Sequence, residues 1–420
     1  MIDLKRLTTE PEYRAGIERK RVPAGLIDEV IELELKRRDL DSRVQVLRAQ
    51  RNAASKAIGA AAPDDREAKI AEASALKHTL DAEERSLSEL DALVNDRALS
   101  IPNPAHESVP DGGEEDSIVL REVGEQTPPP PLDHADLGER FGFVETEAAV
   151  AMSGSRFASL RGGAVLLELA LVQWVTSKLV SHGFTPVVPP VLVREHALVE
   201  AGFFPTDRSQ VYEVDEGELF LVGTSEVPLS ALHRGALLDA ADLPLRYAGI
   251  SPCFRREAGT HGRDTRGIFR VHQFDKVEMF SYCDPTKSWD ELELILSIEE
   301  EIVSGLGLPY RVVNIAAGDL GNPAAKKFDI EVWLPSEGRY RELTSCSNYL
   351  EYSARRLGTR VRGADGAGNE LLHTLNGTAC AVGRTLLFLF EHYQRENGTV
   401  LDVPDVLRQY LGTDLLRAPK

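Results

Sequence analysis

The sequence predicts an α+β fold, in which helices pack on a mostly antiparallel sheet and an antiparallel helical hairpin precedes that sheet. Three observations lead to this prediction. Residues 26–58 and 73–94 repeat apolar positions in alternating steps of four and three, which is typical of coiled coils. Strand-like runs follow one another through the second half of the chain, which favours antiparallel pairing. Residues 249–280 join two such runs through a charged, glycine-rich loop, and this pattern predicts a long hairpin.

Length and composition limit what the protein can be. With 420 residues, two domains are expected, and we place them at residues 1–112 and 113–420. The net charge of -19 argues against a general polycation, so any nucleic-acid contact must come from a local basic region. No signal peptide is evident and no apolar run approaches ~20 residues, so we expect a cytoplasmic protein without a membrane span. The cysteines are too widely spaced for a zinc motif and too few for a disulfide scaffold; they are Cys253, Cys283, Cys346 and Cys380.

The helical hairpin is expected over about residues 26–98, with a break at residues 59–65. Its first helix is basic, with seven basic and two acidic residues at positions 36–56, whereas positions 64–96 hold ten acidic and four basic residues. The basic residues either pair with the acidic returning helix or displace counterions from the phosphates of a polyanion. Charge alone leaves both interpretations open. The register positions are Leu26, Val30, Leu33, Arg37, Leu40, Val44, Leu47, Arg51, Ala54 and Ile58, then Ala73, Leu76, Leu80, Glu83, Leu87, Leu90 and Val94.

The second arm of the predicted β-hairpin alternates from Ile268 onward. One face carries Phe269, Val271, Val277 and Met279, and the other carries Arg270, His272, Phe274, Lys276 and Glu278. Charged residues stand before and within the loop; they are Arg255, Arg256, Glu257, Arg263, Asp264 and Arg266. A guanidinium can bind two phosphate oxygens at once, and Phe274 offers a flat surface for a base. The pattern predicts a nucleotide site, and the alternative is a solvated hairpin with surface ion pairs.

The rest of the chain supplies further strands and helices. Residues 101–124 are rich in proline and glycine, as linkers are, and residues 128–131 predict an extended spacer. An apolar helix is expected over 164–180, followed by a strand over 184–193 whose prolines suit a sheet edge or an interface. Neither common glycine-rich nucleotide motif is present, so a nucleotide must be held by side chains from a sheet. Further strands are expected at 210–212, 218–222, 246–250, 310–314, 328–334 and 338–345, and further helices at 229–238, 289–306, 348–357 and 383–395.

Several separated segments carry a resemblance to a known family. They are residues 223–226, the hairpin segments 254–257 and 270–274, residues 341–348, and residues 374–386, which enter a helix. Together with the helical arm, they make the chain resemble the class II aminoacyl-tRNA synthetases, and specifically the bacterial-type seryl-tRNA synthetases, over essentially its whole length. The resemblance implies a class II catalytic domain that activates L-serine with ATP to seryl-adenylate. It also implies transfer of the seryl group to the 3'-terminal adenosine of tRNA(Ser), with tRNA(Sec) as a further substrate.

The resemblance implies a role for each residue that meets ATP. Arg255 would stabilise charge at the α-phosphate, Arg384 would bind the γ-phosphate, and Phe274 would stack on the adenine. Glu342, with Ser345, would hold Mg²⁺, since carboxylate and phosphate oxygens suit that ion. The implied catalytic residues are Arg255, Arg384 and Glu342, although Arg384 could also be a buried ion-pair partner. The implied ATP set is Arg255, Arg256, Glu257, Val271, Phe274, Glu342, Leu343, Thr344, Ser345 and Arg384.

For serine, the resemblance implies Glu278 and Thr378 at the hydroxyl group and Thr224 with Glu226 at the ammonium group. Each could instead be a satisfied structural polar group. No general base is needed in the first step, where orientation and charge stabilisation suffice. The implied serine set is Thr224, Ser225, Glu226, Arg255, Glu278 and Thr378. The resemblance also implies tRNA contacts from Arg43, Arg48, Arg51 and Lys56, and a homodimer around Pro189 and Pro190.

Two departures from the family pattern lie near the implied serine site, namely Ala379-Cys380 and Asn322-Pro323. They leave open a specialised copy with the same chemistry, either antibiotic-tolerant or supplying seryl-tRNA to a biosynthetic pathway. Two other classes of protein are disfavoured. A ligase that loads serine onto a carrier protein would not need the arm, and a non-enzymatic coiled-coil scaffold would not need Arg255, Glu278 and Arg384.

Overall fold

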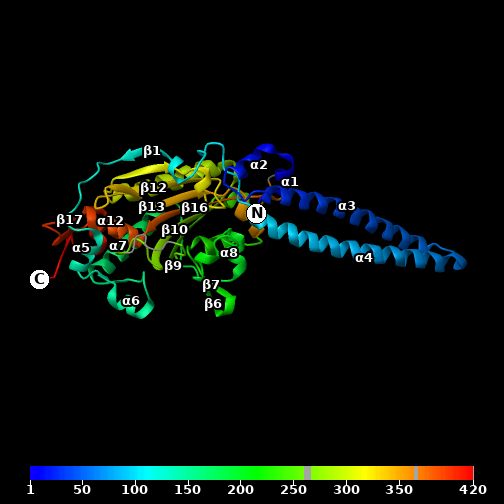
Figure 1. Ribbon diagram of the computed structural model, residues 1–420, viewed down its shortest axis with the longest axis horizontal. Helices are drawn as coiled ribbons and strands as arrows, with labels where there is room; N and C mark the ends of the chain where they lie inside the picture. Colours follow the sequence, from blue (N-terminus) through cyan, green and yellow to red (C-terminus); the bar gives the residue numbers. More distant parts are fainter. Residues whose placement is uncertain (260–265, 364–367, 420) are drawn as a thin grey trace. The chain divides into compact units, whose positions relative to one another are not determined.

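The computed structural model describes residues 1–259, 266–363 and 368–419. The chain divides into two compact units, Met1–Pro102 and Asn103–Lys420. The smaller unit starts with α1 (Leu4–Thr9) and α2 (Pro11–Glu18) and continues as a long antiparallel pair, α3 (Leu26–Gly59) and α4 (Pro63–Leu99) (Figure 1). Leu40, Val44 and Leu80 form the buried core of this pair. Every predicted register position except Arg51 is buried or half-buried, which confirms the coiled-coil hairpin.

An eight-stranded sheet is the centre of the larger unit. Its order is β1-β11-β12-β13-β16-β10-β9-β4, and every neighbouring pair is antiparallel except β4 with β9. The mostly antiparallel sheet is therefore confirmed, and the proline-containing β4 lies at an edge, as its sequence predicts. The strands are β1 (Ile118–Val123), β4 (Thr185–Val187), β9 (Leu245–Phe254), β10 (Gln273–Cys283), β11 (Tyr310–Asn314), β12 (Lys326–Leu334), β13 (Arg339–Asn348) and β16 (His373–Ala381).

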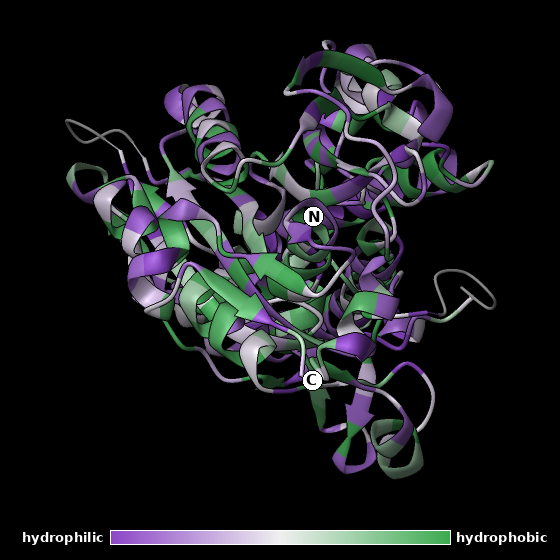
Figure 2. Cartoon of the chain, turned by 90° about the vertical axis from the view of Figure 1, so that its left-hand side faces the viewer, coloured by the Kyte–Doolittle hydropathy of each residue, from purple (hydrophilic) through white to green (hydrophobic). Residues whose placement is uncertain are grey.

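Three helices cover one face of this sheet: α7 (Gly163–Ser181), α10 (Ser288–Gly305) and α12 (Val382–His392). Apolar residues of these strands and helices form the main core, and Figure 2 shows strands near the middle of the view coloured green for hydrophobic residues. Among the described residues, α7 alone is long and apolar enough to cross a membrane, by length and composition only. Its Leu167, Leu171 and Val175 are buried in the main core, so packing against the sheet accounts for much of this apolar character.

The pleat of β10 separates the two faces of the sheet. Val277 and Met279 lie in the main core, whereas Phe274, Lys276 and Glu278 line a cavity on the opposite face. The predicted alternation is therefore confirmed within this strand. Further along the same strand, the side chains of Phe280 and Tyr282 pack with those of α9 (Glu226–Ala231) and α11 (Tyr352–Leu357).

Smaller elements complete the larger unit. A three-stranded sheet packs near α8 (Glu195–Ala201) and consists of β5 (Leu192–Val193), β7 (Leu219–Leu221) and β6 (Tyr212–Val214). The others are α5 (His134–Arg140), β2 (Val144–Glu145), α6 (Glu147–Ser153), β3 (Ser159–Leu160), β8 (Leu237–Asp239), β14 (Arg360–Arg362), β15 (Glu370–Leu371), β17 (Gln394–Arg395), β18 (Val400–Asp402), α13 (Asp405–Leu411) and β19 (Leu415–Arg417).

Several predicted boundaries were wrong. The second arm of the hairpin is a strand only from Gln273, because the residues before it turn toward the cavity: Phe269 packs against Arg341 and Arg384, and Arg270 pairs with Glu257. The expected helix 229–238 ends at residue 231 because β8 pairs in parallel with β14, a partner distant in sequence. The expected strand 184–193 is divided between β4 and β5, and β13 continues to residue 348, where a helix was expected.

Candidate active site

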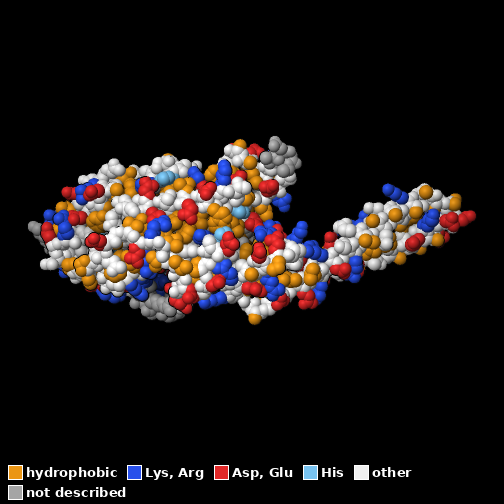
Figure 3. All heavy atoms as spheres, turned by 90° about the horizontal axis from the view of Figure 1, so that it is seen from above, with side chains coloured by type: hydrophobic (Ala, Val, Ile, Leu, Met, Phe, Trp, Pro, Cys, Tyr) orange, Lys and Arg blue, Asp and Glu red, His pale blue; other side chains and the backbone are white. Residues whose placement is uncertain are grey.

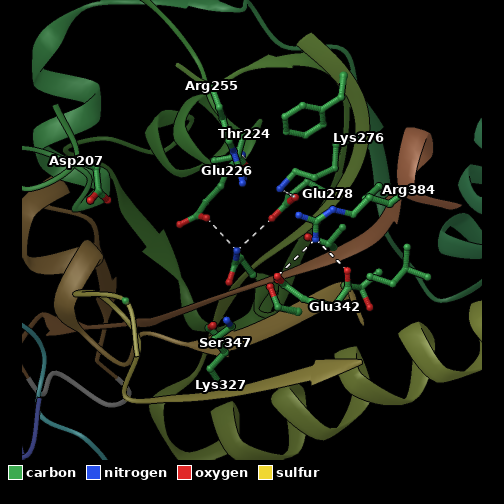
Figure 4. A pocket seen from close by; sticks show the side chains of 18 of the residues that line it. Asp207, Thr224, Glu226, Arg255, Lys276, Glu278, Lys327, Glu342, Ser347 and Arg384 are labelled. Carbon is green, nitrogen blue, oxygen red and sulfur yellow. Dashed lines mark hydrogen bonds and ion pairs between the residues drawn. The ribbon is translucent and has the colours of Figure 1, made fainter. Parts of the chain in front are cut away.

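A cavity of about 390 Å³ lies where β10, β12, β13 and β16 meet the segment after β9 and the first turn of α12 (Figure 4). Arg384 and Glu342 lie together at one end of it, and Arg255, whose charge lowers the pKa of both Glu342 and Glu226, lies between the two ends; we call these three residues the arginine end. Acidic side chains meet at the other end, with Glu226, Glu278 and Thr378, and we call this the carboxylate end. Segments far apart in the sequence therefore supply one cavity with two chemically different ends.

At the arginine end, Arg384 and Glu342 hold each other in place. The Arg384 guanidinium donates to the backbone oxygen of Glu342 at 2.9 Å and lies 3.5 Å from its carboxylate. Partial burial acts to raise the pKa of Glu342, but Arg384, Lys327 and Arg255 together lower it to about 2. Glu342 is therefore a carboxylate throughout the neutral range. Since Arg384 also lines the cavity, its ion pair does not remove it from contact with a ligand.

The other side chains of the arginine end are suited to a nucleotide. Arg255 donates to the backbone oxygen of Gly223 at 3.2 Å, and its guanidinium lies 5.3 Å from the centre of the Phe274 ring. The guanidinium of Arg384 lies 4.9 Å from the centre of the Phe269 ring. Two guanidinium groups held against aromatic faces are only partly hydrated, which strengthens their attraction for phosphate.

A β-bulge in β13 shapes this end of the cavity. Ile330 is opposite Thr344 and Glu331 is opposite Glu342, so Leu343 is an extra residue in the ladder. Simple alternation would send Glu342 and Ser345, three positions apart, to opposite faces of the sheet. The bulge lets both line the cavity.

At the carboxylate end, one amide joins two acids. Asn376 donates from Nδ2 to Glu226 at 2.9 Å and to Glu278 at 3.1 Å. Glu278 is fully buried and forms an ion pair with Lys276, which comes from the same face of β10. Burial first, and then the charge of Glu278, raise the pKa of Glu226 to about 8. One lysine thus faces two acids: Lys276 balances the charge of Glu278, while Glu226 is mostly protonated near pH 7, and an incoming cation can take the place of its proton.

Most of the residues predicted from the sequence line this one cavity. They are Thr224, Glu226, Arg255, Glu257, Val271, Phe274, Glu278, Glu342, Leu343, Thr344, Ser345, Thr378 and Arg384. Two do not line it. Ser225 is fully buried with its hydroxyl group 3.4 Å from the backbone oxygen of Gly249, and Arg256 is exposed. Arg263 and Asp264 lie outside the described residues, and Arg266 pairs with Asp133 and Asp136 at the surface.

Sequence reasoning assigned no role to four residues that the cavity contains: Lys276, Asn376, Tyr349 and Asp207. A signal existed for the first, because Lys276 was placed on the polar face of β10 beside Glu278. Asn376 and Tyr349 carry no such signal, because they meet Glu226 only through the pairing of β16 and the turn after β13.

The departures from the family pattern also border the cavity. Glu278 is opposite Thr378 and Val277 is opposite Cys380, so Ala379 is the extra residue of a second bulge. Ala379 and Cys380 are buried in the main core, whereas Asn322 and Pro323 line the cavity itself. Asn322 donates from its amide to Thr206 at 2.6 Å.

On the helical arm, the four predicted contact residues differ in their partners. Arg43 lies 3.6 Å from Asp39 and from Glu83, and Arg48 lies 2.8 Å from Glu84 across the hairpin. Figure 3 shows acidic and basic side chains interspersed along the arm. Arg51 bonds to Asn52, and within the described residues no ion pair engages Arg51 or Lys56. Ion pairs across the hairpin therefore engage the charges of Arg43 and Arg48, whereas the charges of Arg51 and Lys56 are free of ion pairs within the described residues.

The chain was compared with known proteins. Residues 1–105 match the seryl-tRNA synthetase N-terminal domain, and residues 210–393 match the tRNA synthetase class II core domain (G, H, P, S and T). The serine–tRNA ligase of Acidothermus cellulolyticus is 46% identical, and that of Streptomyces coelicolor is 44% identical; the first alignment covers 99% and the second 98% of each chain. The crystal structure of seryl-tRNA synthetase from Pyrococcus horikoshii complexed with ATP has a TM-score of 0.93 at 35% identity, and the match covers 100% of both chains.

The sheet, its bulged strands and the matched core domain define a class II aminoacyl-tRNA synthetase. The N-terminal match and the near-full-length identity narrow this class, and the chain belongs to the seryl-tRNA synthetase family of ligases.

The charge pairing at the carboxylate end predicts the outcome of one substitution. Lys276→Met leaves the buried Glu278 without its cation, and we expect a loss of about 3–5 kcal/mol in the free energy of unfolding. Urea denaturation measures this loss. The double variant Lys276→Met, Glu278→Gln should recover a large part of it, and the exposed Lys287→Met is the matched control. A Lys276→Met variant as stable as the wild type would show that the Lys276–Glu278 ion pair does not stabilise the fold.

Proposed function

We propose that this chain activates L-serine with ATP and transfers the seryl group to the 3'-terminal adenosine of tRNA(Ser), and also of tRNA(Sec). The observation that carries the proposal is the two-ended cavity, in which arginines lie beside an acidic, hydrogen-bonding end. ATP fits the arginine end, serine fits the carboxylate end, and their reacting groups then meet between the two. Proximity and charge stabilisation supply the first step.

The arginine end is proposed to bind the triphosphate. Arg255 reaches the α-phosphate, where it neutralises charge as the serine carboxylate attacks and pyrophosphate leaves. Arg384 holds the γ-phosphate, and Phe274 stacks on the adenine. The relative from Pyrococcus horikoshii, whose structure contains ATP, supports this assignment because its fold matches along the whole chain.

Mg²⁺ is proposed to bind together with ATP. The described residues contain no group of three or more histidine, cysteine, aspartate or glutamate side chains that could hold a metal ion alone. Mg²⁺ does not need such a group, because it commonly binds to one or two carboxylates together with the phosphates of a substrate. Glu342, ionised and next to Ser345 in the cavity wall, is the fitting carboxylate. The ion would supply neutralisation of phosphate charge.

The carboxylate end is proposed to read serine. Its ammonium group pairs with Glu226 beside Thr224, and its hydroxyl group bonds to Glu278 and Thr378. Alanine would leave the buried Glu278 without that partner, and a site of this kind rejects an analogue lacking a hydroxyl group strongly. The bulge at Ala379 sets the position of Thr378, so this departure is compatible with serine chemistry. A specialised copy would keep the same reaction.

The arm is proposed to bind tRNA through shape and backbone contacts. Arg51 and Lys56 present unpaired charge, and Arg43 and Arg48 can exchange exposed ion pairs for phosphates, because exposed pairs contribute little. We assign residues 1–112 to a tRNA-binding domain and residues 113–420 to the catalytic domain. The four cysteines are free and buried, which suits the reducing cytoplasm where we place the enzyme.

A homodimer is proposed from exposed apolar residues on α7 and in the segment that follows β4. Leu166 and Leu169 are 53% and 60% exposed, and Val188, next to Pro189 and Pro190, is 80% exposed. Large apolar side chains gathered on one surface mark an interaction site. A second copy supplies the same surface, as two-fold symmetry requires.

The first prediction of the proposed function concerns catalysis. Arg384→Ala should lower serine-dependent pyrophosphate exchange by at least about 100-fold, because it removes a fixed charge from the reacting phosphates. Arg395→Ala, at an exposed ion pair, is the control and should behave as wild type. Wild-type exchange in the first variant would remove Arg384 from the mechanism.

The second prediction concerns the arm. Deleting residues 30–95 should leave pyrophosphate exchange within about 3-fold of wild type, since the cavity belongs to the other unit, but lower charging of tRNA(Ser) by about 100-fold or more. Glu29 and Arg97 form an ion pair at 3.0 Å, so the new ends are close. Equal loss of both activities would mean that the arm is structural.

The third prediction concerns pH. Because the pKa of Glu226 is raised to about 8, its proton must leave before serine's ammonium group can pair with it. The KM for serine should therefore fall as the pH rises from about 6 to 8, by up to about 10-fold per unit, while the KM for ATP stays flat. Glu226→Gln should abolish this dependence. A flat profile in the wild-type enzyme contradicts the proposed ion pair.

The fourth prediction concerns assembly. Leu169→Glu should convert a dimer to a monomer in sedimentation experiments, because it places a charge in an apolar interface. Leu35→Glu, on the arm and 53% exposed, is the matched control. A monomeric wild-type protein would overturn the proposed dimer.

A further inference from the structure

The floor of the cavity contains a gap in strand pairing. Strands β13 and β16 pair only at Cys346 with Gly377, Ser347 with Asn376 and Asn348 with Leu375. Beyond this point the two strands continue without pairing to each other, and there they carry Thr344 and Thr378. The ladder therefore ends where one strand supplies the arginine end and the other supplies the carboxylate end.

A carboxyl group from the helix layer occupies this gap. Glu299 of α10 is fully buried, and its Oε2 lies 3.1 Å from Oγ1 of Thr344. Within the described residues its Oε1 makes no hydrogen bond; it lies close to β16 at Gly377, and the nearby backbone N–H of Thr378 favours the charged form of the carboxyl group. One side chain from behind the sheet thus bonds to β13 and contacts β16 in the unpaired part of the sheet.

The approach of Glu299 depends on a glycine. A Cβ added to Gly377 would lie 2.4 Å from Cγ2 of Ile295 and 2.9 Å from Oε1 of Glu299. Any larger residue at position 377 would push α10 away from the sheet. The absence of a side chain at Gly377 therefore allows both the close packing of α10 on the sheet and the position of the Glu299 carboxyl group.

The surroundings of Glu299 favour its neutral form. Burial raises its pKa well above the usual range, and the nearby Asp329 and Glu278 raise it further, while Thr344 and Thr378 only partly oppose them. Within the described residues no ion pair reaches it. A protonated carboxyl group can both donate and accept hydrogen bonds, so Glu299 can keep its bond to the hydroxyl group of Thr344 in the neutral form.

We propose that Glu299 is a positioning residue that fixes the distance between the two ends of the cavity by bonding to Thr344 of β13 and packing against β16 at Gly377, across the unpaired part of the sheet. It touches no substrate and acts through those two residues. The inference rests on the proposed function, because the two ends must bind ATP and serine for their separation to matter. Loss of the bridge lets the strands separate or shift, and small displacements of reacting groups cost large factors in rate.

The test compares two variants of the full-length enzyme. Glu299→Gln keeps the shape and both hydrogen-bonding capacities of a neutral acid, so its kcat in serine-dependent pyrophosphate exchange should stay within about 3-fold of wild type. Glu299→Leu keeps the volume but removes the hydrogen bond to Thr344 and the polar contact with β16, and its kcat should fall by about 10- to 100-fold. If the leucine variant does not fold, Thr344→Val breaks the same contact from the other strand with little change of shape.

Glu291→Gln is the matched control, because Glu291 is buried on the same helix but bonds to Arg246 and Ser281, away from the gap. Its Tm should fall while kcat and both KM values stay at the wild-type level. The inference is overturned if the leucine variant keeps wild-type kcat, or if the glutamine variant is as slow as the leucine variant. If the wild-type enzyme showed no serine-dependent pyrophosphate exchange, the proposed function itself would be overturned. This outcome is distinct from a failure of the inference about Glu299.

Discussion

The structure depends on the burial of acidic side chains beneath a small polar cavity. Glu278 is fully buried on β10, and its ion pair with Lys276 and its hydrogen bond from Asn376 are what make that burial tolerable. The same strand sends Val277 and Met279 into the core on its other face. A single pleated strand therefore anchors the domain and presents the charge that a ligand must satisfy.

Departures from regular pairing turn this sheet into a site. The bulge at Leu343 turns Glu342 and Ser345 to one face, and the bulge at Ala379 sets Thr378 opposite Glu278. Where β13 and β16 stop pairing, the carboxyl group of Glu299 closes the gap from the helix layer. These irregularities place the arginine end and the carboxylate end at a fixed separation, which is what joining two substrates requires.

The sequence predicted those features that follow from local periodicity. The heptads of the arm follow from one buried seam between two helices, and the alternation in β10 follows from one strand face that packs in the core. Both patterns are present in the structure. The bulges, the turn at residues 268–272 and the parallel pairing of β8 with β14 depend on partners distant in the chain, so periodicity could not reveal them. For the same reason Asn376 and Glu299 were missed, while Arg255, Glu278 and Arg384 were found through the resemblance of their segments to a family.

The most direct test of the account is a crystal structure of the enzyme with a non-hydrolysable seryl-adenylate mimic. The account predicts the phosphate-like group within hydrogen-bond distance of Arg255 and the seryl hydroxyl group within hydrogen-bond distance of Glu278 and Thr378. A mimic bound away from both Arg255 and Glu278 would contradict it, whatever the affinity.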